Sequence, residues 1–440
     1  MALSWFQRWR RRSEQKSKKQ NLLNDLELDK TETSSITSKT QTSGPVPVEN
    51  VSQKVQPDSV FGSLCSLRHQ PLEKQPYYHG AVARSEIQPL LDKDGDFLVR
   101  KSYRGGKAQI LLTVMWQNQL RQFQIEKQGS FYQFEDKRFY TVASLIYYHW
   151  SSAVPITAES GVVLQRAVPL EKWELSHDAV TLIRKIGEGS FGEVFYGSIL
   201  NNNEPMNVAV KTCHTKVSDD EKRSLLAEAR IMRRYIHPNV VRMIGICAQK
   251  EPLMIVMEYI TGGSLKTYLT EKGKQITNKQ RSKFMVDIAS GMQYLEHCEC
   301  IHRDLAARNC LLGKDNVVKI GDFGMSRVGQ SYLLLHRAKV PVRWTAPEAI
   351  NHSIYTSKSD IWSFGVVIWE IWTNGQMPYA GKNVKQIRKF IEDGYRLTPP
   401  ETMPCEYVPL MQSCWRFNPI ERPTFQQLYD KLKELDLFVV

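Results

Sequence analysis

Twice along this chain of 440 residues, runs with the two-residue alternation of β-strands give way to apolar runs with helical spacing. The first cycle covers 76–168, where the strand patterns GDFLVRKS, AQILLTVMW and LRQFQIEK precede the helical run VASLIYYHW. The second cycle starts at Trp173, with strand patterns up to about residue 259 and helical patterns beyond it. The chain is therefore predicted to fold as two successive α+β domains.

The first 75 residues differ from both cycles. Residues 21–60 are rich in Ser, Thr, Gln and Lys, with few aromatic residues. Such a composition buries too little apolar surface to offset the entropy lost on ordering, so we predict a mostly disordered tail over 1–75. Residues 169–179 contain no Gly/Ser run, which predicts a short, semi-rigid linker between domains over 76–168 and 180–437.

The distribution of charge disfavours a nucleic-acid-binding protein. The net charge is +13, but seven Lys and Arg residues stand against one Glu among the first twenty residues. Much of the excess thus belongs to the tail, where no fold is expected to organise it into a basic face.

Cysteine usage and hydropathy indicate the compartment. The eight cysteines form no CxxC pair and no metal-ligand spacing, which is typical of a reducing, intracellular environment. No run approaches 18 uninterrupted apolar residues, and the N-terminus lacks the apolar core of a secretory signal. It also carries Ala2 where myristoylation requires glycine. We therefore expect a cytoplasmic protein.

A glycine motif opens the second cycle. IGEGSFGEV (186–194) places Gly187, Gly189 and Gly192 in the pattern GxGxxG. By itself this pattern fits either a nucleotide-binding loop or a glycine-rich turn. A strand pattern follows it here, whereas a dinucleotide-binding motif would open a helix. Glycines between two strands favour a flap whose backbone N–H groups close over phosphates.

A lysine and a glutamate further along are predicted to pair. Lys211 ends the strand pattern NVAVK, and Ser218 with Glu221 forms a capping box for the helix that follows. Glu228 falls on the apolar side of that helix, where an unpaired carboxylate would be costly. We therefore expect a Lys211–Glu228 ion pair that aims the ammonium at nucleotide phosphates.

The stretch IHRDLAARNC (301–310) resembles the catalytic loop of protein kinases, and GDFGMS (321–326) and APE (346–348) follow it in kinase order. The resemblance implies that Asp304 accepts the proton of the attacking hydroxyl. It also implies that Asn309 and Asp322 bind Mg²⁺, with Mn²⁺ as a possible substitute, and that ATP is the phosphoryl donor. Besides Lys211, the residues implied to contact ATP are Ile186, Gly187, Gly189, Gly192, Val194, Ala209, Met257, Glu258 and Leu311.

The two alanines of DLAARN indicate the acceptor. Serine/threonine kinases carry a lysine two residues after the catalytic aspartate, where this chain has Ala306, and Arg308 stands two residues later. This pattern resembles tyrosine kinases, because the small side chains leave room for a phenol and the Arg308 guanidinium neutralises charge. Pro341 and Trp344 match the platform on which tyrosine kinases rest the substrate ring.

An arginine in the first cycle is predicted to point inward. Both faces of the strand that carries Arg100 begin with apolar residues, and a structural ion pair is one explanation for such a residue. With YYHGAVAR upstream, however, the unit resembles an SH2 domain. The resemblance implies that Arg100 binds phosphotyrosine, with Arg84 and Ser102 in the same pocket. Gln122 and Gln124 depart from the usual residues of that pocket, which predicts weaker auxiliary contacts.

The two units together resemble the Fes/Fer family of cytoplasmic tyrosine kinases over 76–437, on the runs RGGKAQILLTV, GMSR and VPVRWTAPEA. The family's F-BAR and coiled-coil region has no counterpart in residues 1–75. The resemblance implies an autophosphorylated tyrosine nine residues before Pro341, a position that Tyr332 holds. Arg303 and Arg327 are the expected partners of its phosphate, and a merely exposed tyrosine is the alternative.

The expected fold is thus a multidomain α+β chain. An SH2 domain, with a central antiparallel sheet between two helices, precedes a bilobal kinase. The expected function is transfer of the ATP γ-phosphate to protein tyrosine, with recruitment and activation through phosphotyrosine-containing partners. The alternative is a catalytically weak phosphotyrosine-binding scaffold. All the catalytic motif residues are present, which favours the enzyme.

The N-terminal tail generates one prediction of its own. Trp5, Phe6 and Trp9 beside several arginines fit a short interfacial helix that binds anionic lipid, although Arg10 falls within its apolar arc. A peptide of residues 1–30 should then co-sediment with liposomes in proportion to their phosphatidylserine content. Binding without such dependence would leave the alternative, a solvated basic tail.

Overall fold

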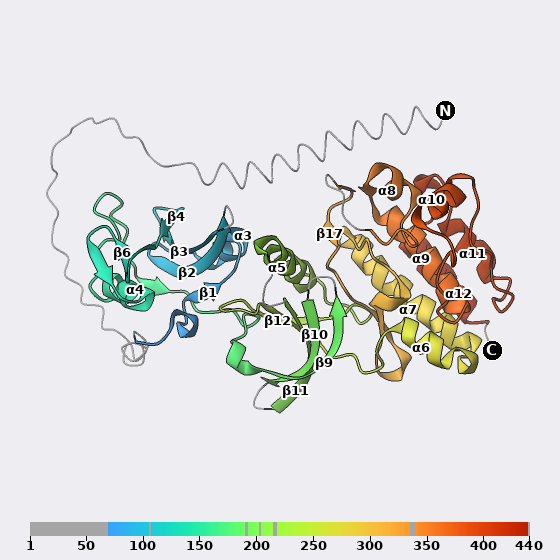
Figure 1. The fold of residues 1–440 in the computed structure, drawn as a ribbon, viewed down its shortest axis with the longest axis horizontal. Coiled ribbons are helices and arrows are strands. Elements are labelled where there is room, and N and C mark those ends of the chain that lie inside the picture. Colours follow the sequence, from blue (N-terminus) through green and yellow to red (C-terminus); the bar gives the residue numbers. More distant parts are fainter. Residues whose placement is uncertain are drawn as a thin grey trace.

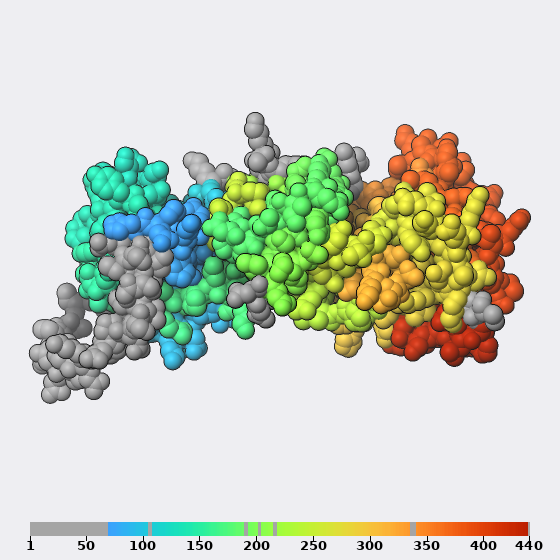
Figure 2. All heavy atoms as spheres, turned by 90° about the horizontal axis from the view of Figure 1, so that it is seen from below, coloured from blue at the N-terminus to red at the C-terminus, as the bar shows by residue number. Residues whose placement is uncertain are grey.

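The computed structural model describes residues 69–438, apart from 105–106, 190–191, 202–203, 214–217 and 335–339. These residues form three masses in chain order, with the first domain at one end, a sheet-rich lobe in the middle and a helical lobe at the other end (Figures 1 and 2). No helix within the described ranges is long and apolar enough to cross a bilayer.

The ordered part begins slightly before the predicted boundary at residue 76. Most of the predicted tail lies outside the described residues, but Leu72–Lys74 forms a 3₁₀ turn. Leu72 packs against the core of the first domain, and Gln75 is buried. The last residues of the tail are thus ordered because Leu72 finds an apolar surface to cover.

The first domain has a five-stranded sheet in the order β1-β2-β3-β4, with β8 also paired to β2. Alternation along β2 sends Phe97 and Val99 into the core that contains α4, whereas Leu98 packs with Ile87 of α3. Helices therefore cover both faces, as predicted. The elements are β1 (Tyr78–Gly80), α3 (Arg84–Ile87), β2 (Asp96–Arg104), β3 (Lys107–Trp116), β4 (Gln119–Gln124), β5 (Glu126–Gln128), β6 (Phe131–Phe134), β7 (Lys137–Phe139), α4 (Val142–Ser151) and β8 (Arg166–Ala167).

The middle lobe combines an antiparallel sheet, in the order β12-β13-β11-β10-β9, with one helix, α5. The predicted capping box starts α5, because Ser218 Oγ accepts from Glu221 N–H at 3.3 Å and Glu221 Oε2 accepts from Ser218 N–H at 2.8 Å. Such a cap typically contributes about 1 kcal/mol. The elements are β9 (Val180–Gly189), β10 (Gly192–Asn201), β11 (Glu204–Cys213), α5 (Asp219–Arg233), β12 (Met243–Cys247) and β13 (Met254–Glu258).

The helical lobe is organised around α9, in which all but the first two of 16 residues are buried. A helix without an exposed face has neighbours on every side, here including α6, α7 and α11. The elements are α6 (Leu265–Lys272), α7 (Asn278–His297), β14 (Cys300–Ile301), β15 (Cys310–Leu312), β16 (Val318–Ile320), β17 (Arg327–Val328), β18 (Tyr332–Leu333), α8 (Pro347–His352), β19 (Ile354–Tyr355), α9 (Ser357–Trp372), α10 (Val384–Glu392), α11 (Tyr407–Cys414) and α12 (Phe425–Asp436).

The linker is more than the semi-rigid spacer that its composition predicts. It runs parallel beside β12, where Ile246 N–H donates to Trp173 O at 2.8 Å and Leu175 N–H donates to Ile246 O at 2.9 Å. Glu174, between them, forms a buried contact of 2.9 Å with His79 of the first domain. The linker is thus bonded to both domains. Its main chain pairs with the edge strand β12, and its Glu174 side chain contacts His79 of the first domain.

Candidate active site

A cleft of about 730 Å³ lies between the middle and helical lobes. Val194 and Ala209 line it from the sheet, and Leu311 lines it from β15. The residues predicted to contact the nucleotide that line this cleft are Ile186, Gly187, Gly192, Val194, Ala209, Lys211, Met257, Glu258 and Leu311. The surroundings of Gly189 lie outside the described part of the chain. Gly192 has a φ of +159°, and a Cβ there would lie 1.7 Å from Thr212 O, so the hairpin over the cleft requires glycine at this position. Val241 and Thr267 also line the cleft, and no motif in the sequence identifies them.

The predicted ion pair forms at the back of this cleft. Lys211 Nζ donates to Glu228 Oε1 and Oε2 at 2.7 and 2.8 Å, and to Asp322 Oδ1 at 3.2 Å. Burial would lower the pKa of the Lys211 ammonium, but the carboxylates of Glu228 and Asp322 outweigh it and raise that pKa. The lysine therefore stays charged while it joins three separate elements, β11, α5 and the segment after β16.

Asp304 is held by its neighbours in the catalytic loop. Arg308 Nη2 forms a short ion pair with Asp304 Oδ1, and Asn309 Nδ2 donates to Asp304 Oδ2 at 2.9 Å. Burial raises the pKa of Asp304 to about 6, against the opposing effects of Arg308 and Asn309. A carboxylate that titrates near neutrality suits a general base at physiological pH.

The backbone around Asp304 is strained and is anchored by α9. Arg303 has a φ of +71°, in the left-handed region. Asp360 of α9 accepts hydrogen bonds from His302 N–H at 2.7 Å and from Arg303 N–H at 2.8 Å, which hold this turn. Burial raises the pKa of Asp360 to about 7. Sequence reasoning missed Asp360, because nothing in its helix pattern marks a residue that lies 56 positions after Asp304.

A second contact joins the catalytic loop to the segment that carries Asp322. His302 Nε2 lies 3.1 Å from Gly321 O, and the His302 ring packs edge-on against Phe323 at 5.2 Å. Burial lowers the pKa of His302 to about 4. A neutral imidazole that donates to Gly321 O thus ties the turn before Asp304 to the segment that carries Asp322.

The predicted metal ligands are compatible with Mg²⁺ in their donor chemistry. The Asn309 amide nitrogen is used by Asp304, which leaves its oxygen as an acceptor. The Asp322 side chain is half exposed, and only its Oδ1 is bonded to Lys211. These are two hard oxygen donors of the kind that Mg²⁺ takes from proteins when phosphates complete its shell. No group of three or more His, Cys, Asp or Glu residues suited to a metal occurs in the part of the chain that the structure describes.

The Tyr332 ring lies over the two arginines that the sequence proposes for its phosphate. Arg303 Cζ is 4.5 Å and Arg327 Cζ is 5.3 Å from the ring centroid. Tyr332 belongs to the short strand β18, which pairs with β19 through Tyr355. Two guanidinium groups beside Tyr332 would attract a phosphate group on its hydroxyl.

In the first domain, the Arg100 side chain points inward from β2, as predicted. It is buried, and Nη1 donates to Val82 O at 3.3 Å, in the loop that leads into α3. Arg84 is the first residue of α3, and Ser102 lies two residues along β2 on the face of Arg100. The guanidinium is therefore next to the start of the helix that carries Arg84.

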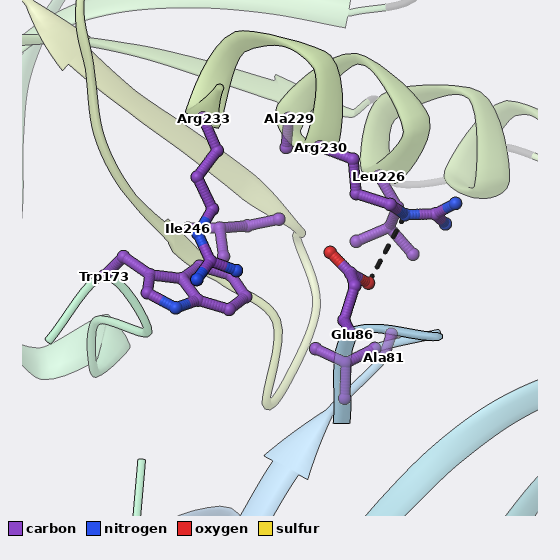
Figure 3. A pocket seen from close by; sticks show the side chains of 9 residues that line it. Ala81, Glu86, Trp173, Leu226, Ala229, Arg230, Arg233 and Ile246 are labelled. Carbon is purple, nitrogen blue, oxygen red and sulfur yellow. Dashed lines mark ion pairs between the residues drawn. The ribbon is translucent and has the colours of Figure 1, made fainter. Parts of the chain in front are cut away.

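The first domain contacts the middle lobe both after β12 and along helix α5, which carries Glu228. Ala81 N–H donates to Ala248 O at 2.9 Å, and a Cβ on Gly80 would lie 2.1 Å from the same oxygen. Glu86 of α3 forms an ion pair of 3.3 Å with Arg230 of α5, as Figure 3 shows. A cavity of about 10 Å³ remains between them, room for at most one water molecule, so the surfaces are closely fitted.

A second group of contacts closes the other side of this interface. Lys222 Nζ of α5 lies 5.5 Å from the Tyr103 ring centroid and 2.7 Å from Glu251. Lys101 Nζ lies 5.3 Å from the same ring and 3.8 Å from Glu251. On the linker side, Arg233 stacks on Trp173 with its Cζ 4.0 Å from the ring (Figure 3). Helix α5 is thus held by the first domain and the linker as well as by its own lobe.

The Lys211–Glu228 pair generates a prediction about stability. Lys211→Met leaves the nearly fully buried Glu228 carboxylate without its main cation, which should cost about 3–5 kcal/mol in the free energy of unfolding. The double variant Lys211→Met/Glu228→Leu replaces both charges with apolar groups and should recover most of that loss. Urea unfolding of both variants tests this. Equal unfolding free energies for the single and double variants would contradict the buried-pair interpretation.

Comparisons with known proteins agree with this geometry. The family described as "Protein tyrosine and serine/threonine kinase" matches residues 180–432, and the SH2 domain family matches residues 77–149. Neither match extends into residues 1–76. The chain is 46% identical over 365 residues to the tyrosine-protein kinase transforming protein Fps of avian sarcoma virus (strain PRCII), which covers 82% of this chain and 68% of that protein.

Two cellular proteins are similar over the same region. Human tyrosine-protein kinase Fer is 43% identical over 377 residues, 85% of this chain and 45% of Fer. Fer-related kinase 1 of Caenorhabditis elegans is 38% identical over 365 residues, 81% of this chain and 93% of that protein. The chain thus spans less than half of Fer but nearly all of the nematode kinase. With both domains matched, and with the glycine motif, Lys211, Glu228, Asn309 and Asp322 lining one cleft, the chain belongs to the Fps/Fer family of tyrosine-protein kinases, with an SH2 domain ahead of a kinase domain.

Proposed function

We propose that the cleft transfers the γ-phosphate of ATP to a tyrosine hydroxyl, with Asp304 as the general base. The observation that carries this is the arrangement of Asp304 with Arg308 and Asn309 on one side and the Lys211–Glu228 pair on the other. Lys211 binds the phosphates of ATP, and Asp304 accepts the proton as the phenol oxygen attacks. Arg308 neutralises charge at the acceptor, and it reaches there because its guanidinium stacks on Trp344 at 4.3 Å.

Asn309 and Asp322 would hold Mg²⁺ between them and the phosphates. Bound there, the metal supplies positive charge that offsets the charge of the transferring phosphoryl group. Gly187 and Gly192, in the hairpin above the cleft, approach the phosphates through their backbone N–H groups. Val194, Ala209 and Leu311 provide the apolar walls for the adenine ring.

The SH2 domain recruits the enzyme to tyrosine-phosphorylated proteins through Arg100, with Arg84 and Ser102 beside it. We place this protein in the cytoplasm, where such partners are found. The lipid-binding segment within residues 1–20 lies outside the described residues and stays a sequence-based prediction.

Phosphotyrosine binding also raises kinase activity in this proposal. Arg100 donates to Val82 O, and Val82 lines the same interface cavity as Glu86 and Arg230. A ligand that orders the Arg100 pocket therefore favours the position of α3 that contacts α5. Because α5 carries Glu228, this position favours the Lys211–Glu228 pair. The alternative is an SH2 domain that serves only as a tether.

Replacement of the base tests the catalytic proposal. Asp304→Asn keeps a hydrogen-bond partner for Arg308 and removes the proton acceptor, so kcat should fall about 10²–10⁴-fold. In the wild type, kcat/KM for a tyrosine peptide should rise as pH passes about 6, because Asp304 must lose its proton to act as a base. Wild-type turnover by Asp304→Asn, or phosphoserine as the product, would contradict the proposal. Intact phosphotyrosine binding with no turnover by the wild type would favour the scaffold.

The coupling proposal is tested on one soluble peptide substrate, with and without a phosphotyrosine peptide. Wild-type turnover should rise by about 5-fold or more on peptide binding, within the usual range of coupling energies. Arg100→Ala should lose this response. Arg230→Glu should also lose it by repelling Glu86, and Glu86→Arg/Arg230→Glu should restore it.

Arg223→Glu is the matched control, because Arg223 lies on the exposed side of α5 and, among the described residues, pairs with Asp220 and Asp219 O of its own helix. It should keep the full response. Equal turnover in every variant and condition would reduce the SH2 domain to a tether.

A further inference from the structure

Glu370, near the end of α9, is a buried carboxylate to which the mechanism above gives no role. Its side chain is 1% exposed. A single oxygen, Oε2, accepts two hydrogen bonds, from Ala307 N–H at 3.0 Å and from Trp344 Nε1–H at 2.9 Å. Burial raises the pKa of the Glu370 carboxyl, and these two bonds together with the Arg308 charge oppose that rise.

The two donors come from the two segments that must meet at the acceptor. Ala307 belongs to the catalytic loop and directly precedes Arg308. Trp344 belongs to the predicted platform for the substrate ring. Arg308 joins the same two segments directly, because its guanidinium stacks on the Trp344 ring at 4.3 Å and pairs with Asp304. The spacing between the base and the platform therefore depends on where Oε2 lies.

Helix α9 is suited to set that spacing. It is buried on all sides, and its other carboxylate, Asp360, holds the turn before Asp304 through two backbone N–H groups. Glu370 follows ten residues later and holds the turn after Asp304. One rigid helix thus fixes the catalytic loop at both ends, and through Glu370 it also fixes the platform.

We propose that Glu370 is a positioning residue that joins the catalytic loop to the substrate platform and thereby sets how the enzyme binds and orients its tyrosine acceptor. The inference rests on the proposed transfer to tyrosine. Its effect is specific to the acceptor, because the residues proposed to contact ATP lie on β9, β10, β11, β13 and β15. Among the described residues, the side-chain hydrogen bonds of Glu370 go to Ala307 and Trp344 instead. Loss of the shared oxygen should therefore weaken peptide binding and leave ATP binding unchanged.

Steady-state kinetics of Glu370→Ala and Glu370→Gln test this. Glu370→Ala should raise the KM for a tyrosine peptide by roughly tenfold or more and lower kcat, with the KM for ATP unchanged. Glu370→Gln retains a carbonyl oxygen that can accept from both donors, and it should keep the peptide KM within about threefold of wild type.

A purely structural role would give a different result. Tyr407→Phe removes a buried hydrogen bond between Tyr407 and Ser282 in the same lobe, and it serves as the matched control for lost stability. This variant should lower the melting temperature without changing either KM. If Glu370→Ala behaves like Tyr407→Phe, with both KM values at wild type, the positioning role is wrong.

Trp344→Phe provides a test that does not depend on how well Glu370→Ala folds. It removes the indole donor but keeps a ring under Arg308, so it should raise the peptide KM without changing the ATP KM. Combined with Glu370→Ala, it should raise the peptide KM by less than the product of the two single effects, because both changes remove the same contact. Full independence of the two changes would overturn the proposal. Absence of phosphotyrosine product from the wild type would instead overturn the proposed function itself.

Discussion

The pairing of Lys211 with Glu228 is the interaction on which the remaining structure depends. Both charges are nearly removed from water, so neither can be kept without the other. The pair requires the C-terminal end of β11, the central strand of the sheet, to meet helix α5 at one separation, which defines the back of the cleft. The opposite constraint comes from outside the lobe, because the SH2 domain and the linker contact α5 through Glu86, Arg230 and Trp173. Because α5 is held from both sides, a shift in its contacts with the SH2 domain would also move Glu228 relative to Lys211.

Buried carboxylates also hold an element in place in the helical lobe. There the buried carboxylates Asp360 and Glu370 lie on a rigid helix and hold backbone N–H groups of a short loop. Inside a protein, where water screens poorly, hydrogen bonds are stronger than at the surface. They can therefore hold a residue such as Arg303 at a left-handed φ that it would otherwise avoid. The turn that precedes Asp304 is thus held by anchoring from α9 as well as by its local sequence.

Much of the site was predictable from local pattern. Alternation along β2 correctly indicated an inward Arg100, and the capping box correctly indicated where α5 begins. The placement of Glu228 on the apolar side of α5 led to its partner, because a buried carboxylate needs one. The boundary of the tail was less accurate, since Leu72 alone gives no periodic signal and is ordered only by the core it covers.

The sequence by itself determined which residues make up the proposed site: those predicted to bind phosphate, the predicted proton acceptor, and Ala306 and Arg308, which favour a tyrosine acceptor. These properties follow from residue type and short spacing, which a linear pattern records. Only the tertiary structure decided which distant residues hold them in place. Asp360 and Glu370 act on the catalytic loop from a helix more than 50 residues away, and Glu174 joins the linker to His79 across 95 residues. Such contacts depend on how whole elements pack. A buried carboxylate in an apolar helix has the same local sequence pattern whichever N–H groups donate to it.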